Sequence, residues 1–205
     1  GTDSIMSMSD FAAYGAPVFW FSPDEPELDT KSGKKINIPS HFPFDAKTDS
    51  PVVYYQFKQI LKKDKSKSSA LIKNYSNKDS TFLNLAAISA VSITYTHFYN
   101  SESGLGSHPF DTEQAEFKYY VRRKTGKDKV RRYYIYFVRV TAKAHALEWY
   151  DNIYEIDAKN LFYELDLPFN ILVEEGKHAS CTDMNGDGYY TPGYDVNVRK
   201  NDAWG

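Results

Sequence analysis

The chain has 205 residues, with 25 Lys and Arg against 27 Asp and Glu, so its formal net charge is −2 at pH 7. This length suits one large domain or two small ones with a sizeable core, and the balanced charge argues against nucleic acid as the main partner. The single cysteine, Cys181, excludes an intrachain disulfide. No apolar run approaches the roughly 18 residues that a membrane span needs, so we expect no transmembrane segment.

The first third of the chain reads as short strands between long polar loops. Residues 1–10 are small and polar, and we expect a flexible terminus there. The apolar run 16–21 (APVFWF) predicts a buried strand that ends in a Ser-Pro-Asp-Glu-Pro turn, and residues 52–60 (VVYYQFKQI) alternate as a strand does. The lysine-rich segment 62–69 predicts a solvated hairpin tip.

Residues 81–92 are apolar and predict either a strand or a short helix. The alternation of a strand then continues through residues 91–99. His97 shares a face with the apolar side chains of this run, so we interpret it as a hydrogen-bonded core histidine.

The second half of the chain contains a clear hairpin pattern. Residues 115–121 and 131–140 predict two strands joined by the basic turn 122–129. Residues 142–157 fit a short helix as well as a strand and loop, and one more strand is expected within residues 161–173. Strands at this spacing, with little helical periodicity, predict a mainly β fold. We expect one β-sandwich domain over residues 11–205, with long loops and a few short helices.

The stretch His108-Pro-Phe-Asp-Thr-Glu113 holds one imidazole and two carboxylates within six residues. If Asp111 and Glu113 lie at the start of a strand, the period of two places both side chains on one face. Two carboxylates so near to each other repel, which is energetically unfavourable unless a positive charge lies between them. The stretch therefore indicates either a divalent cation with His108 as a nitrogen ligand, or a surface turn with solvated charges.

Two further histidines carry a weaker signal. His178 lies in Gly176-Lys-His-Ala-Ser180, and His145 lies in a segment with no clear pattern. An isolated histidine after a strand is more often a structural hydrogen-bonding group than a ligand, and the same holds for His145.

Residues 183–188 (DMNGDG) match the front half of a calcium-binding loop, in which oxygen-bearing side chains alternate. Those side chains are Asp183, Asn185 and Asp187. The twelfth position of the loop is Tyr194 where an EF-hand has Glu, so this is not an EF-hand. Two interpretations stay open: a second, calcium-binding site closed by Asp195 or Asp202, and an ion-free turn held by Asx hydrogen bonds.

Residues 95–113 (YTHFYNSESGLGSHPFDTE) resemble the signature region of necrosis-inducing, Nep1-like proteins. In that family an aromatic strand leads to a glycine turn and a Gly-His-Arg-His-Asp-Trp-Glu heptapeptide. His108, Asp111 and Glu113 match the first His, the Asp and the Glu at identical spacing. The resemblance implies that these three residues coordinate a divalent cation in a β-sandwich, with Asn100 at the position of a further ligand.

This chain departs from the heptapeptide at two positions. Phe110 and Thr112 stand where the family has its second His and its Trp. The resemblance therefore implies the metal site more strongly than it implies the toxin-like, cytolytic activity of the family.

The flanking segments are similar to those of Vps62-related proteins. Residues 16–25 resemble their Ala-Pro-Val and Pro-Asp-Glu strand and turn, and residues 175–180 resemble their Gly-x-His-Ala-Ser segment. This likeness implies that His178 joins the metal ligands on one rim of the sandwich, with His145 as a residue of the same rim.

The sequence thus predicts a secreted or cell-surface protein that uses a divalent metal to bind a polar ligand, a glycan or a glycolipid or lipid head group. Ca²⁺ or Mg²⁺ is the expected ion, with Zn²⁺ or Mn²⁺ as the alternatives. A metal-dependent hydrolase with His178 or Glu113 as its base is the second hypothesis. A structural protein in which the ion only fixes loops is the third. Gly1 stands where an initiator Met would be, so a secretion leader could have been removed.

Overall fold

The computed structural model describes residues 5–21, 25, 39, 51–61, 72–74, 82–103, 108–143, 152–155 and 168–183. Within these ranges the chain forms strands and one short helix. In chain order they are β1 (Ile5–Ser7), α1 (Met8–Tyr14), β2 (Val18–Phe21), β3 (Val53–Leu61), β4 (Ile72–Asn74), β5 (Phe82–Asn84), β6 (Ile88–Ser101), β7 (Pro109–Thr125), β8 (Arg131–Lys143), β9 (Asn152–Glu155), β10 (Asn170–Val173) and β11 (Ser180–Thr182).

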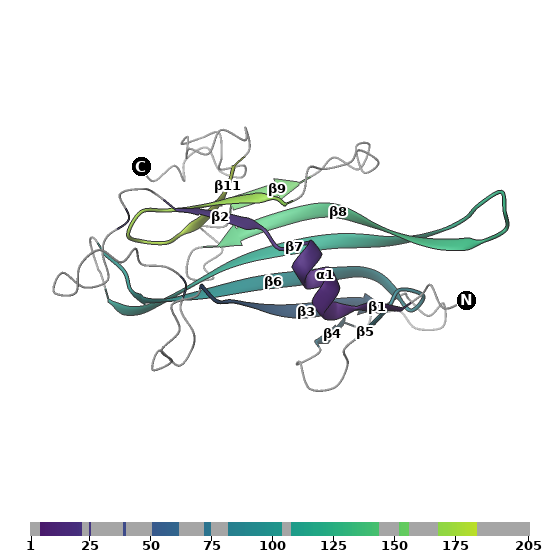
Figure 1. Ribbon diagram of the computed structural model, residues 1–205, viewed down its shortest axis with the longest axis horizontal. Coiled ribbons are helices and arrows are strands. Elements are labelled where there is room, and N and C mark those ends of the chain that lie inside the picture. The colour runs from purple at the N-terminus through teal and green to yellow at the C-terminus, as the bar shows by residue number, and fades with distance from the viewer. Residues whose placement is uncertain are drawn as a thin grey trace.

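The largest element is an antiparallel sheet with strand order β4-β3-β6-β7-β8-β9 (Figure 1). Its long central strands β6 and β7 alternate between buried and half-buried positions, as strands with one covered face do. β6 and β7 pair so that Tyr99 lies opposite Asp111 and His97 lies opposite Glu113. This register brings the aromatic strand and the carboxylate-bearing strand together on the buried face.

A second sheet, in the order β11-β10-β2, covers part of that face. β10 pairs with β11 in an antiparallel hairpin, whereas β2 runs parallel to β10. Ile171 of β10 belongs to the same buried core as Phe117 and Val140 of the large sheet. The described part of the chain is therefore mainly β, as the strand spacing predicts.

Residues 5–10 correct one prediction. They were expected in a flexible terminus, but they form β1 and the start of α1. Met8, Phe11 and Ala12 are buried at helical spacing, and the side chain of Ser7 caps the helix by accepting the backbone N–H of Asp10 (3.3 Å). The helix has only seven residues, so its periodic signal in the sequence is short and easily missed.

The other strand predictions divide as follows. The segment 16–21 contains β2, the segment 52–60 contains most of β3, and the predicted hairpin is β7 and β8, so these strands are confirmed. The burial predicted for 16–21 is wrong, because β2 alternates between exposed and half-buried side chains, with Val18 39% and Trp20 49% exposed. Of the segment 81–92, the described residues 82–92 form β5, a turn and the start of β6, and contain no helix. The lysine-rich segment 62–69 lies outside the described residues, as does most of 142–157. In the described part of the chain, no helix has the length and apolar character needed to cross a membrane.

Candidate functional site

A cluster of buried polar side chains lies where β6 ends and β7 begins. Asp111 and Glu113 of β7 are 2% and 0% exposed and occupy the buried face together, as the period of two predicts. Their cross-strand neighbours Tyr99 and His97 are fully buried as well. Buried carboxylates need hydrogen bonds and positive charge around them, so the surroundings of Asp111 decide what this cluster can do.

His178 lies between two carboxylates. Its Nδ1 is 3.0 Å from Oδ2 of Asp111, and its Nε2 is 2.8 Å from Oε1 of Glu25. All three side chains in these two ion pairs are 0% exposed. The His178 ring also stacks on the ring of Tyr99, with centroids 3.8 Å apart and 9° between the planes.

The loop between β10 and β11 places His178 there. The His178 backbone N–H donates to the carbonyl of Glu174 (2.9 Å), and the Glu174 N–H donates to the carbonyl of Ala179 (3.0 Å). His178 has φ of 61° and Gly176 has φ of 70°, so the loop turns through the left-handed region. The Gly176 N–H also donates to Oε2 of Glu25 (3.0 Å), so one loop orients both the histidine and a carboxylate that faces it.

His178 is the positive charge that this pair of carboxylates requires. Burial alone would lower the pKa of His178, but the hydrogen bonds to Asp111 and Glu25 and the charges of both carboxylates outweigh it and raise the pKa. Burial, followed by the charges of Glu113, Asp111 and Glu25, raises the pKa of Tyr99, so its phenol stays protonated. The cluster is thus an imidazolium and a neutral phenol among carboxylates.

His97 is the second buried imidazole. Its Nδ1 is 2.7 Å from the hydroxyl of Tyr99, its Nε2 is 3.3 Å from Oγ of Ser180, and its ring lies 4.6 Å from that of Phe19. Burial lowers the pKa of His97 to about 3, against the opposing charge of Asp111. His97 is therefore neutral and hydrogen-bonded in the core, which confirms the interpretation from the sequence.

The polar cluster reaches the surface at Glu102, His108 and Lys177, which we call the rim. The Glu102 side chain is 1% exposed, whereas that of His108 is 49% exposed and that of Lys177 is 27% exposed. Oε1 of Glu102 lies 2.7 Å from Nζ of Lys177 and 3.3 Å from Nε2 of His108. The backbone fixes this arrangement, because the Glu102 N–H donates to the carbonyl of His108 (3.2 Å).

The orientation of His108 is set by its other ring nitrogen. Nδ1 lies 3.0 Å from the carbonyl oxygen of Phe110, and a carbonyl can only accept, so Nδ1 carries a hydrogen. Phe110 has φ of 66°, which is uncommon for a bulky residue. Nε2 then faces the carboxylate of Glu102, 3.3 Å away. Histidines that ligate metals have this same arrangement, with the second nitrogen donating to a carbonyl.

The five residues predicted to ligate a metal are not gathered around one point. Asp111 and His178 are hydrogen-bonded, and Glu113 shares their buried face. His108 is on the rim, and Asn100 takes the alternate position on β6, on the face opposite Tyr99. In the ranges that the structure describes, no group of three or more His, Cys, Asp or Glu side chains is arranged to hold a metal ion.

The donor groups fit a cation at the rim better than a cation beside His178. Both nitrogens of His178 face carboxylates, so ligation by this ring would require it to give up Asp111 or Glu25. His108 and Glu102, in contrast, point one nitrogen and one oxygen toward each other near the surface. At the rim, His108 and Glu102 can each offer one donor atom to an ion.

Several predicted site residues cannot be placed. His145, Asn185, Asp187 and Asp195 lie outside the described residues, so the calcium loop stays a prediction. Asp183, its first residue, directly follows β11 and is buried.

Glu25, Glu102, Lys177 and Tyr99 contribute to the cluster without having been predicted as site residues. Glu25 ends the Pro-Asp-Glu turn, and Glu102 lies two positions beyond Asn100, where a further ligand was expected. A signal for both was therefore present in the quoted motifs, but only the folded chain shows which acidic group faces which histidine.

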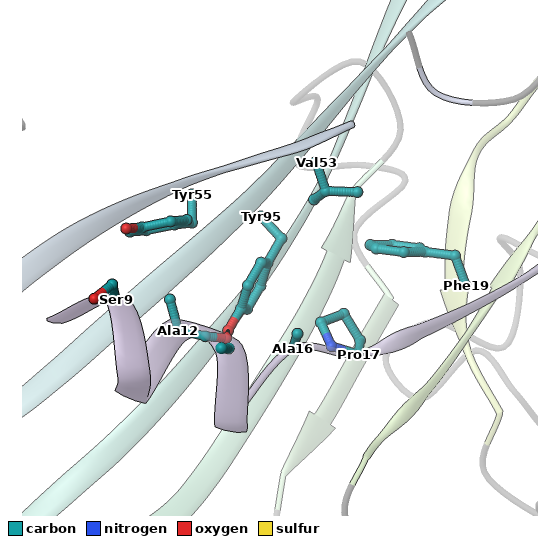
Figure 2. A pocket seen from close by; sticks show the side chains of 9 residues that line it. Ser9, Ala12, Ala16, Pro17, Phe19, Val53, Tyr55 and Tyr95 are labelled. Atoms are coloured by element: carbon teal, nitrogen blue, oxygen red, sulfur yellow. Dashed lines mark hydrogen bonds between the residues drawn. The ribbon is translucent and has the colours of Figure 1, made fainter. Parts of the chain in front are cut away.

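A cavity of about 250 Å³ opens elsewhere, between α1 and the large sheet. Figure 2 shows Tyr95 reaching from β6 toward the helix, with Val53 and Tyr55 of β3 beside it. The residues that line it are Ser9, Ala12, Ala13, Ala16, Pro17, Phe19, Val53, Tyr55 and Tyr95. None of them is charged, so this apolar cavity is chemically distinct from the rim.

Comparisons with known proteins add no relative: no family model, no curated protein and no solved structure matches this chain. The resemblance to Nep1-like and Vps62-related proteins therefore rests on the quoted residues alone and stays a prediction.

Proposed function

We propose that this protein binds a polar ligand, a glycan or a lipid head group, through a divalent cation held at the rim by His108 and Glu102. The observation that supports this most is the orientation of His108. Its Nδ1–H is committed to the carbonyl of Phe110, and its Nε2 faces a carboxylate oxygen 3.3 Å away. One imidazole and one carboxylate fill only two coordination positions of a divalent cation. The other positions stay open to oxygen atoms of the glycan or head group.

The choice of ion follows from these donors. A set with an imidazole nitrogen suits Mn²⁺ or Zn²⁺ better than Ca²⁺ or Mg²⁺, which prefer oxygen alone. Lys177 is a competing cation, because its ammonium lies 2.7 Å from the same oxygen of Glu102. Its side chain is partly exposed and flexible, so it can move aside when an ion binds.

Binding is favoured over hydrolysis by the burial of the candidate bases. His178 and Glu113, the two groups that could activate a water, are both 0% exposed. His178 also uses both ring nitrogens on carboxylates. A general base must reach the proton that it removes, and neither group reaches the surface in this arrangement.

The surroundings of the rim suit a sugar. Phe110 is 61% exposed and lies next to His108, where its ring offers a flat apolar surface beside polar groups. Ligand sites commonly combine aromatic contacts with a few polar groups that fix orientation. The extracytoplasmic location and the toxin-like activity expected from the resemblance belong to the same proposal, since surface glycans and lipids are the partners it implies.

Calorimetric titration with Mn²⁺, Zn²⁺, Ca²⁺ and Mg²⁺ tests the cation site. The wild type is expected to bind Mn²⁺ or Zn²⁺ with one site per chain, and His108→Ala is expected to weaken that binding at least about tenfold. Lys58→Met, which removes an exposed lysine on β3, is the control and should bind as the wild type does. Equal binding by His108→Ala and the wild type would contradict the proposal. Glycan-array binding with and without a chelator then tests the ligand.

A further inference from the structure

The hairpin of β7 and β8 carries a local excess of positive charge in a chain whose net charge is negative. From residue 118 to residue 139 there are nine basic residues and one acidic residue, Asp128, which gives this segment a formal charge of +8. The whole chain has a charge of −2, so the remainder carries −10. Figure 1 shows the hairpin extending beyond the rest of the large sheet. It lies at the opposite end of β7 from Asp111, so it is separate from the rim.

The basic residues on one face of this hairpin alternate with tyrosines. Phe117, Tyr119 and Val121 point into the core, so the alternate residues of β7 point outward. Cross-strand pairing places Tyr120 beside Tyr136, Arg122 beside Tyr134, and Lys124 beside Arg132. We call this set, with Lys118 at its inner end, the basic track.

The tyrosine rings hold the cations in place. The ammonium of Lys118 lies 5.6 Å from the ring centre of Tyr120, and the guanidinium of Arg122 lies 5.9 Å from the same centre. Lys124 lies 5.4 Å from the ring of Tyr134 and 5.8 Å from that of Tyr136. Cation–π contacts at these distances favour fixed positions for Lys118, Arg122 and Lys124. Arg132, at the outer end of the track, is paired with the carboxylate of Asp128.

We propose that the basic track binds a linear acidic polysaccharide. From Lys118 to Lys124 the track spans roughly 20 Å at about 3.4 Å per residue, and it is two strands wide. A narrow, straight and positive surface matches a linear polyanion better than it matches a broad membrane surface. The phenolic hydroxyl groups of the tyrosines add hydrogen-bond donors for sulfate, carboxylate and sugar oxygens.

Two features favour a polysaccharide over the other polyanions. Single-stranded nucleic acids are bound by stacking bases on aromatic faces, but here Lys and Arg side chains lie over the tyrosine rings. Acidic protein partners usually also bury an apolar core. The track offers none, because its residues are all Lys, Arg or Tyr.

The chain provides a matched control for this surface. Arg122 and Arg123 are adjacent and exposed, but they lie on opposite faces of the hairpin, and Arg123 pairs with Tyr133 instead of Tyr134. Arg131 is likewise exposed and paired with Thr125, away from the track. A double variant Arg122→Gln/Lys124→Gln and a double variant Arg123→Gln/Arg131→Gln therefore remove equal charge from the two faces.

The experiment measures binding of full-length protein to heparin, to an oligothymidylate and to phosphatidylserine vesicles at roughly 0.15 M salt. Heparin is expected to bind most tightly. The track variant should bind it about tenfold more weakly, and the opposite-face variant within about threefold of the wild type. Equal losses in both variants, tighter binding of the oligothymidylate or vesicles, or no heparin binding would each overturn the proposal. Melting temperatures equal to that of the wild type would confirm that both variants fold. We expect this result because all four substituted side chains are exposed.

Discussion

The imidazole of His178 stacks on the ring of Tyr99 at 3.8 Å while its two nitrogens face Asp111 and Glu25. Positive charge on the ring is stabilised from both edges by carboxylates and from one face by an aromatic ring. A histidine from the β10–β11 loop therefore supplies positive charge to Asp111, one of the two carboxylates for which the sequence suggested a metal ion. The cation site that we propose lies at the rim instead.

Replacing His178 by Ala is expected to lower the free energy of unfolding by about 3–5 kcal/mol, because two buried carboxylates lose their counter-charge. Urea denaturation of the variant measures this loss. Lys177→Ala is the control, since its ion pair with Glu102 is partly exposed and is worth about 1 kcal/mol or less. A His178→Ala loss as small as that of the control would show that the buried pair carries little stability.

The acid stability of the protein should depend on His97. Its pKa is about 3 in the folded chain and about 6.5 when unfolded, so only the unfolded state takes up a proton between these values. The contribution of His97 to the free energy of unfolding is therefore present above about pH 6.5. It falls by up to about 1.4 kcal/mol per pH unit as the pH drops toward 3.

The variant His97→Gln tests this dependence. Its free energy of unfolding, measured from pH 7 to pH 4.5, is expected to fall less steeply than that of the wild type. The reason is that unfolding of the variant takes up about one proton fewer. The polar groups around His97 are Tyr99, Ser180, Asp111 and His178, and all are kept in this variant. Parallel pH profiles for the two proteins would mean that His97 does not stay neutral in the folded chain.

Two tyrosines of the core should respond differently to loss of their hydroxyl groups. The Tyr95 hydroxyl donates to the carbonyl of Ala12 (2.7 Å) and ties α1 to the large sheet. Tyr95→Phe is expected to cost about 1–2 kcal/mol, because a buried carbonyl loses its donor. In the described part of the chain, the buried hydroxyl of Tyr119 has no hydrogen-bond partner, so Tyr119→Phe should be neutral or stabilising. Urea denaturation of both variants measures the contrast, and equal losses would contradict it.

Removal of Lys177 should strengthen cation binding at the rim. Its ammonium occupies the same oxygen of Glu102 that we propose as a metal ligand. Lys177→Met keeps a long side chain but removes the competing charge, so Mn²⁺ or Zn²⁺ should bind several-fold more tightly, as measured by calorimetry. Weaker binding in this variant would show that Lys177 supports the site instead of competing for it.

The sequence predicts the parts of this molecule that depend on local pattern. The alternation around His97 and along residues 111–121 correctly indicates which side chains face the core. It cannot show the contacts of His178, because its partners Asp111 and Glu25 lie 67 and 153 positions away. The sequence shows that Asp111 needs a positive partner. Which group provides it depends on how the distant β10–β11 loop packs.

The short helix α1 shows a different limit. Its three buried residues, Met8, Phe11 and Ala12, span little more than one turn among small polar residues. A pattern this short is not distinguishable from a loose segment until the sheet that covers it is known. The cap at Ser7 was the one local signal that the helix offered.

The most direct test of the central claim is to follow the histidine ring nitrogens by NMR as Mg²⁺ or Zn²⁺ is added. The account predicts that His178 shows the signature of an imidazolium at neutral pH and does not change with added ion. It also predicts that His108 keeps its hydrogen on Nδ1 while its Nε2 resonance shifts on addition of Zn²⁺. A shift at His178, or no shift at His108 with any ion, would contradict the assignment of the cation site to the rim.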